Sequence, residues 1–186
     1  VNGENEVSGA VTKIVDLALR DMRLNPKRSY IDFSIAYDMV SKGEVRFSYP
    51  YFKTSRRQAD DPTVLFSAPL MEVESALYYS KVHNDFSNSK IDISQQRIGR
   101  VLGYAYGERF DPLLTGARLF QSEVLALKAL LDGHIDLLPM TRRVGQALVL
   151  KYFPWRYHEF KRLRGENYIS RDAVHLITVN DKEGKK

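Results

Sequence analysis

The stretch from Thr54 to Arg57 carries the side chains best suited to binding a ligand. A threonine hydroxyl is followed three residues later by the second of two adjacent arginines, Arg56 and Arg57. A guanidinium binds a carboxylate or phosphate through two parallel hydrogen bonds. Exposed arginine pairs are also common on ordinary protein surfaces, so a basic surface turn is the alternative interpretation. We therefore treat this stretch as a candidate anion site.

The residues before it predict where this site stands in the fold. Apolar and polar residues alternate over 45–49, which is typical of a short strand with one face on a core. Pro50 cannot donate a hydrogen bond to a neighbouring strand, so we expect the strand to end there. Tyr51, Phe52 and Thr54 would then lie beyond its carboxyl end, where open α/β sheets bind their ligands.

A second candidate site is the stretch R-I-G-R-V-L-G-Y-A-Y-G at 97–107. Its pattern predicts an apolar strand, a glycine turn and then the start of a helix. Free N–H groups at a helix start bind anions. The glycines stand four residues apart and do not form the G-x-G-x-x-G pattern of dinucleotide sites. An ordinary strand-to-helix turn is the alternative interpretation.

Side chains for catalysis or metal binding are not arranged in any recognisable pattern. The chain has no cysteine, and its four histidines, His83, His134, His158 and His175, lack metal-ligand spacing. No nucleophile elbow or phosphate-binding loop is present. We expect no catalytic residue, no metal site and no cofactor, and therefore a protein that is not an enzyme.

Composition is typical of a globular protein of one large domain or two small lobes. The 186 residues are 44% hydrophobic and 27% charged, with a net charge of +5. Basic residues are spread along the chain and the densest cluster, Arg156–Arg164, is interpreted as a solvated connection, so no nucleic-acid partner is expected. The apolar runs are too short for a membrane span, and residues 1–6 lack a signal pattern. We expect no membrane insertion of this segment.

Hydrophobic periodicity predicts an α/β protein. The helices are expected at 11–22, 34–40, 122–131 and 144–152. The strands are expected at 30–33, 45–49, 71–79, 97–102, 135–138 and 174–179, with Pro139 ending the strand before it. The polar stretch 80–96 is interpreted as the connection into a second lobe.

Five segments in this order resemble the bacterial extracellular solute-binding proteins of the polar amino-acid type. They are E-V-S-G-A-V-T-K-I-V-D-L-A-L at 6–19, P-Y-F-K-T-S-R-R at 50–57, V-L-F-S-A-P-L at 64–70, the glycine-containing stretch at 97–107, and L-L-D-G-H-I-D-L-L-P at 130–139. The resemblance covers nearly the whole chain. It implies a two-lobed type 2 periplasmic-binding-protein fold, with mostly parallel sheets flanked by helices and two crossing strands near 77–80 and 167–170.

The resemblance also implies an organisation and a role. Lobe 1 is expected to comprise residues 1–78 and 170–186, and lobe 2 residues 79–169. The family's first strand would precede Val1 and its closing helix would follow Lys186. The protein is expected to be periplasmic, exported by a signal absent from this chain, and to close on a small carboxylate-bearing or amino-acid-like solute. Its macromolecular partner would be an ABC permease or, if the chain is a sensor domain, a signalling module. A lyase or dehydratase on the same scaffold is a weaker alternative.

The family's ligand contacts carry over to particular positions. Thr54 and Arg57 align with the threonine and the carboxylate-binding arginine, whereas Arg56 is expected to face solvent. Thr141 stands where the family usually has the acid that pairs with the ligand's ammonium, so the ligand need not be a standard amino acid. The predicted ligand-binding residues are Tyr49, Tyr51, Phe52, Thr54, Arg57, Tyr104, Ala105, Tyr106 and Thr141.

Overall fold

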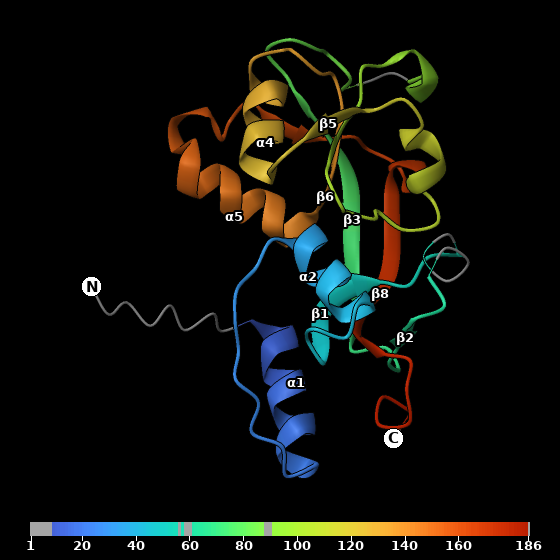
Figure 1. Cartoon of the computed structure of the whole chain (residues 1–186). Helices are drawn as coiled ribbons and strands as arrows, with labels where there is room; N and C mark the ends of the chain where they lie inside the picture. The colour runs from blue at the N-terminus through green and yellow to red at the C-terminus, as the bar shows by residue number, and fades with distance from the viewer. Residues whose placement is uncertain (1–8, 56, 58–60, 88–90, 186) are drawn as a thin grey trace. The chain divides into compact units, whose positions relative to one another are not determined.

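The computed structural model describes residues 9–55, 57, 61–87 and 91–185. These residues form two compact units (Figure 1). Unit 1 comprises Val1–Tyr51, Asp61–Met71 and Ala173–Lys186, and unit 2 comprises Phe52–Asp60 and Glu72–Asp172. The predicted lobe boundaries differ from these at residues 52–60, 72–78 and 170–172, all of which group with unit 2. Ser55 and Arg57 bond to Glu108 and Gly103 of that unit. The division into binding lobes stays a prediction.

The chain contains both helices and strands, as the periodicity predicts. The helices are α1 (Ala10–Asp21), α2 (Phe33–Ser41), α4 (Glu123–Leu131) and α5 (Arg142–Tyr152). The short 3-10 helices are η1 (Ile93–Gln95), η2 (Asp111–Leu114), η3 (Pro154–Arg156) and η4 (Glu166–Tyr168). The strands are β1 (Phe47–Phe52), β2 (Val64–Phe66), β3 (Met71–Ser80), β4 (Gly99–Val101), β5 (Arg118–Phe120), β6 (Leu138–Thr141), β7 (Phe160–Arg162) and β8 (Ile169–Val179).

Unit 1 packs a small core between α2 and its strands. Val40 of α2 is fully buried against Tyr51, Val64 and Ile177. The ring of Phe33 lies 4.3 Å from that of Tyr51, centroid to centroid. β2 pairs antiparallel with β8, with Val64 opposite Val179. The core therefore joins the start, middle and end of the chain.

Unit 2 is built around β3, whose two faces are both buried. Ala76 and Tyr78 face one apolar cluster, which includes α4, whereas Leu77 and Tyr79 face another. Burial on both faces explains why residues 76–79 show no alternation of apolar and polar types. β3 pairs antiparallel with β6 and β7, while β4 and β5 form a parallel pair. Figure 1 shows α4 and α5 beside β5 and β6.

The predicted helix after Ser122 is confirmed, and its start has a clear local cause. The Ser122 hydroxyl accepts a hydrogen bond of 3.3 Å from the Leu125 amide, which satisfies one of the donors that a helix start leaves unpaired. Leu127, Leu130 and Leu131 are fully buried on the inner face. The helix ends at Leu131, and Gly133 follows with a φ of 73°, a conformation that glycine adopts without strain.

Asp136 ties the chain between α4 and β6 to the start of β4. The residue is 8% exposed, and its carboxylate accepts bonds from the Arg97 backbone amide at 2.9 Å, from Arg97 Nε at 2.8 Å and from Arg97 Nη2 at 2.7 Å. These bonds hold the pKa of Asp136 below its ordinary value of 3.8. A buried carboxylate paired in this way fixes the register of the two segments.

Both proline-based strand ends are wrong. Pro50 lies inside β1, which is tolerated because β1 is at the edge of its sheet. Pro139 lies inside β6 opposite Leu77. The Leu77 carbonyl accepts its hydrogen bond from the Leu163 amide at 2.9 Å, so the missing N–H of Pro139 leaves it satisfied.

Three other local predictions are also corrected. The strand expected at 30–33 is absent and α2 begins at Phe33 instead. The helix expected after Gly107 is replaced by the single 3-10 turn η2. Most of the sheet pairings described above are antiparallel, not parallel, because β3 runs opposite to both strands that flank it in unit 2. The α/β class itself is confirmed.

Within the described residues, no helix is both long and apolar enough to traverse a bilayer. The same residues contain no cluster of three or more His, Asp or Glu side chains that could hold a metal ion.

Candidate functional site

Arg57 is held against the glycine turn of unit 2 by backbone carbonyls. Its Nη1 donates to the Phe52 carbonyl at 3.0 Å and its Nη2 donates to the Gly103 carbonyl at 2.9 Å. Its backbone amide donates to Thr54 Oγ1 at 3.3 Å, and Thr54 is only 3% exposed. These contacts fix the guanidinium plane, and a fixed plane is what bidentate binding of a carboxylate needs.

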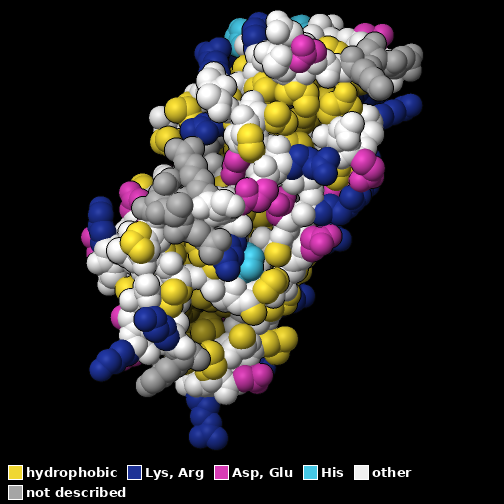
Figure 2. Space-filling view, turned by 90° about the vertical axis from the view of Figure 1, so that its right-hand side faces the viewer, with side chains coloured by type: hydrophobic (Ala, Val, Ile, Leu, Met, Phe, Trp, Pro, Cys, Tyr) yellow, Lys and Arg dark blue, Asp and Glu magenta, His cyan; other side chains and the backbone are white. Residues whose placement is uncertain are grey.

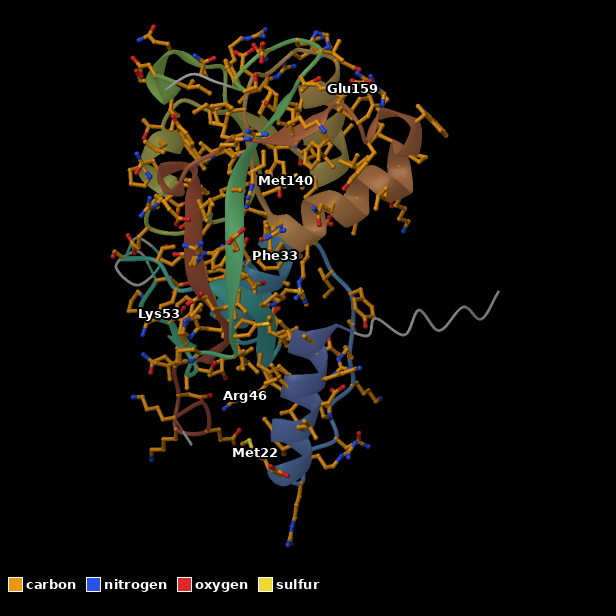
Figure 3. All side chains as sticks on the ribbon, turned by 180° about the vertical axis from the view of Figure 1, so that it is seen from behind. Met22, Phe33, Arg46, Lys53, Met140 and Glu159 are labelled. Carbon is orange, nitrogen blue, oxygen red and sulfur yellow. The ribbon has the colours of Figure 1, made fainter. Side chains whose placement is uncertain are left out.

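A second link joins the same two segments. The hydroxyl and the backbone amide of Ser55 both donate to Glu108 Oε1, the hydroxyl at 2.7 Å. These two donors hold the pKa of Glu108 below its ordinary value of 4.5. The segment from Thr54 to Arg57 is therefore attached on both sides of the turn at 103–107. Lys53, just before it, is exposed (Figure 3).

Two backbone amides of the turn at 103–107 donate hydrogen bonds to nearby residues of the chain. The Tyr106 amide donates to Asp111 Oδ1 at 2.8 Å, and the Tyr104 amide donates to the Val101 carbonyl at 3.3 Å. The helix expected at this turn is replaced by η2, which is one turn long, and these two N–H groups are already bonded. The anion site itself stays a prediction. An anion at this turn would depend mainly on Arg57.

Gly107 lets a carboxylate approach the turn closely. A Cβ atom at this position would lie 2.2 Å from Oδ2 of Asp172, and its φ of 86° is a conformation that favours glycine. Ser170 Oγ donates to the same Asp172 oxygen at 2.5 Å. The backbone of the turn thus packs directly on an acidic side chain of β8.

Asp111 is a candidate site residue that the sequence patterns missed. It accepts the Tyr106 amide and lies close enough to Arg57 and Arg100 to feel their charges. Burial raises the pKa of Asp111 above its ordinary value of 3.8, and the bond from Tyr106 and the charge of Arg57 only partly oppose this. The D-P at 111–112 is an ordinary 3-10 start, so no local signal marks this carboxylate.

No model of a known protein family matches the sequence, and no curated protein matches it. Solved structures do match. The arginine-, lysine-, histidine-binding protein ArtJ of Geobacillus stearothermophilus aligns with a TM-score of 0.74 at 15% identity, over 97% of this chain and 77% of that one. The amino acid ABC transporter substrate-binding protein AbpA of Streptococcus pneumoniae, bound to L-arginine, aligns at 0.73 and 18% identity, over 98% and 75%. The chain has the type 2 periplasmic-binding-protein fold.

Sensor domains share this fold. A histidine kinase sensor domain with similarity to periplasmic binding proteins aligns with a TM-score of 0.75 at 12% identity, over 95% of this chain and 74% of that one. At such identities the likeness concerns the fold alone.

On the periplasmic-binding-protein fold, unit 2 brings together Phe52, Thr54 and Arg57 with the turn that contains Tyr104 and Ala105. Tyr104 and Ala105 are half-buried, and the Tyr104 hydroxyl donates to Glu123. Thr141 lies elsewhere in unit 2, at the end of β6, with Oγ1 3.5 Å from Ser75 Oγ.

Two predicted contacts are core residues. Tyr51 is 1% exposed in the core of unit 1, and its hydroxyl donates to the Phe33 carbonyl. Tyr106 is 5% exposed and its hydroxyl accepts from the Val101 amide at 2.7 Å. We leave both out of the candidate site. Tyr49 is half-buried in unit 1 and its contact stays a prediction, while Arg56 lies outside the described residues.

Two cavities of unit 2 lie away from these residues. One of about 680 Å³ is lined by Arg97, Arg118 and His134 among others, and one of about 610 Å³ by Ile91, Leu113 and Tyr168 among others. The predicted ligand contacts line neither cavity. In Figure 2 hydrophobic side chains gather over the upper part of the displayed face, which belongs to unit 2.

Proposed function

We propose that the protein is an extracytoplasmic solute-binding protein whose ligand carries an anionic group bound by Arg57 and Thr54. The observation that carries the proposal is the fixed guanidinium, which Phe52 and Gly103 orient through their carbonyls. A carboxylate that approaches this group replaces the bond to Gly103 with a charge-assisted one, which is roughly twice as strong as a neutral hydrogen bond.

The ligand also carries a cation. Asp111 is a partly buried carboxylate whose ionised form is disfavoured by burial. An ammonium group beside it would add to the favourable charges of Arg57 and Arg100, and pairing a buried charge avoids a penalty of several kcal/mol. Asp111 would thereby take the role that Thr141 cannot perform. The proposed ligand is amino-acid-like, with the carboxylate at Arg57 and the amine towards Asp111.

Aromatic rings add a preference within this class. Phe52 and Tyr104 are both half-buried and belong to the two segments that Arg57 joins. Stacking of a planar ligand group on such a ring contributes about 0.5–1.5 kcal/mol beyond the buried area. We expect side chains with a planar group, such as a guanidinium, an imidazole or an aromatic ring, to bind more tightly than short aliphatic ones.

The role of binding is delivery of the solute to an ABC permease. A sensing role is the second candidate, supported by the histidine kinase sensor domain and by the periplasmic sensor of a hybrid histidine kinase of Borrelia burgdorferi, with a TM-score of 0.67 at 13% identity, over 97% of this chain and 81% of that one. A sequence that continues into a membrane helix and a signalling domain would support sensing.

The test is a thermal-shift screen followed by calorimetry with arginine, histidine, phenylalanine, glutamate, benzoate and succinate. A ligand at about 100 times its dissociation constant adds about 2.7 kcal/mol of stability. We expect the zwitterions with planar side chains to give the largest shifts. Binding of benzoate as tightly as phenylalanine would remove the role of Asp111. Absence of a shift with every compound would count against the whole proposal.

A further inference from the structure

The excess positive charge of the protein is concentrated in one segment. Residues 142–164, the basic segment, contain seven of the 28 Lys and Arg residues and one of the 23 acids, Glu159. The rest of the chain therefore holds 21 basic and 22 acidic residues. A charge asymmetry of this kind indicates a negatively charged partner.

Several cations of the basic segment are available to such a partner. Glu159 is occupied by Arg156, and Arg142 and Arg162 both pair with Glu74. The exposed residues Arg143, Lys151 and Lys161 form no ion pair within the part of the chain that the structure describes. Lys151 instead lies 5.2 Å from the centre of the Tyr152 ring.

The same segment exposes large apolar side chains. Trp155, the sole tryptophan of the sequence, is 77% exposed. Exposed neighbours in the segment are Val144, Leu150, Tyr152 and Tyr157. On α5, Val144, Leu150 and Lys151 are exposed, whereas Gly145 and Val149 are buried. Tryptophan and tyrosine beside lysine and arginine are the side chains enriched where proteins meet the headgroup layer of a bilayer.

The turn that carries Trp155 is fixed. Arg156 donates to Asp132 at 2.7 Å, to Glu159 at 3.0 Å and to the Leu131 carbonyl, which attaches η3 to the end of α4. Figure 3 shows α5 and the turn after it at the outer edge of unit 2, near the labelled Glu159. The indole is therefore presented outward by a braced turn.

We propose that α5 and η3 bind the surface of a bilayer that contains anionic lipids. Trp155 and Leu150 enter the headgroup layer, and Arg143, Lys151 and Lys161 meet lipid phosphates. The proposed contact is a surface contact, since no helix of the described residues is long and apolar enough to span the bilayer. A nucleic acid would satisfy the cations equally well, but it would leave Val144 and Leu150 without an apolar environment, so the observations favour lipid.

Fluorescence of the single tryptophan tests this contact directly, because the signal comes from Trp155 alone. Vesicles of phosphatidylcholine with phosphatidylglycerol are expected to shift the emission to shorter wavelength, and added salt to reverse the shift. Vesicles of phosphatidylcholine alone are expected to give a much smaller shift. No shift with the anionic vesicles overturns the proposal, as does an equal shift with both vesicle types. A shift produced by a single-stranded oligonucleotide in the absence of any vesicle response assigns the surface to nucleic acid and also overturns it.

Co-sedimentation with the anionic vesicles assigns the residues. Arg143→Gln and Lys151→Gln are each expected to weaken partitioning about fivefold, which corresponds to about 1 kcal/mol per cation. Trp155→Ala is expected to weaken it at least as much. The matched controls are Lys13→Gln and Leu17→Ala, which change an exposed cation and an exposed leucine of α1 and should leave partitioning unchanged. Equal losses in the controls contradict the assignment to α5 and η3. Unchanged melting temperatures show that each variant is folded.

Discussion

Arg57 Nη2 donates a hydrogen bond of 2.9 Å to the carbonyl oxygen of Gly103, so the guanidinium is oriented before any ligand arrives. A ligand carboxylate at this position replaces a neutral acceptor with a charged one. Because the side chain is already ordered, little conformational entropy is lost on binding.

Replacement of Arg57 is expected to abolish most of the binding. Arg57→Ala should weaken the affinity of the ligand found in the screen by about 2–5 kcal/mol, the cost of leaving a buried charge without its partner. Arg57→Lys should recover little, since an ammonium lacks the planar fork. Calorimetry measures both. Arg56→Ala is the matched control and should bind the ligand with unchanged affinity. If Arg56→Ala lost affinity while Arg57→Ala kept it, the assignment of the anion contact to Arg57 would be wrong.

The pH dependence of stability is expected to report on Asp111. Its pKa is raised in the folded state above the ordinary 3.8, so the folded protein holds this proton more tightly than the unfolded chain does. The free energy of unfolding therefore falls as the pH rises from 3.8 through the folded pKa. Asp111→Asn keeps the acceptor for Tyr106 and removes this fall. Urea unfolding at a series of pH values should show that the free energy of unfolding of the variant rises relative to that of the parent as the pH rises. If the two free energies changed in parallel with pH, the assignment would be contradicted.

Asp136 is expected to act in the opposite direction. Its pKa in the folded protein is lowered by Arg97. The ionised carboxylate therefore adds to the free energy of unfolding above the ordinary pKa of 3.8, and this stabilisation is lost as the pH falls through the folded pKa. Asp136→Asn should lower the free energy of unfolding at neutral pH by about 1–3 kcal/mol. The deficit should narrow in acid. Asp21→Asn, a change at an exposed position, should cost little at any pH; a deficit for Asp136→Asn that does not depend on pH would refute the argument.

Two glycines with similar backbone angles separate conformational strain from crowding. Gly107 has a φ of 86° and faces Asp172, whereas Gly116 has a φ of 78° and no atom within 4 Å of a built Cβ. Gly116→Ala should cost about 1–2 kcal/mol, the strain of a left-handed alanine. Gly107→Ala should cost clearly more, since its Cβ also displaces the Asp172 carboxylate. Equal losses of stability in thermal melts would show that the close contact carries no energy.

Sequence patterns predict this fold where burial follows a regular period, as in α1, or where a local cap marks the element, as Ser122 does for α4. They fail where a rule about one residue depends on its neighbours in space. A proline ends a strand only where a neighbouring strand requires its missing N–H as a donor. Pro50 is tolerated because β1 is an edge strand, and Pro139 is tolerated because the Leu77 carbonyl accepts a hydrogen bond from Leu163 instead. Likewise, Arg57 and Thr54 stand out by type and spacing. Asp111 does not, because its importance arises from burial beside Arg57.

The chain of unit 1 is interrupted by residues 52–60 and 72–172 of unit 2, so the first and last described residues belong to the same unit. A label at an exposed position such as Lys13 therefore follows unit 1, whereas a label at Thr115 follows unit 2. The sequence contains no cysteine, so Lys13→Cys and Thr115→Cys would introduce the sole two thiols, one in each unit. A donor and an acceptor dye attached to them would convert a ligand-driven change in the separation of the two units into an optical signal, which makes this connectivity a ready framework for a biosensor.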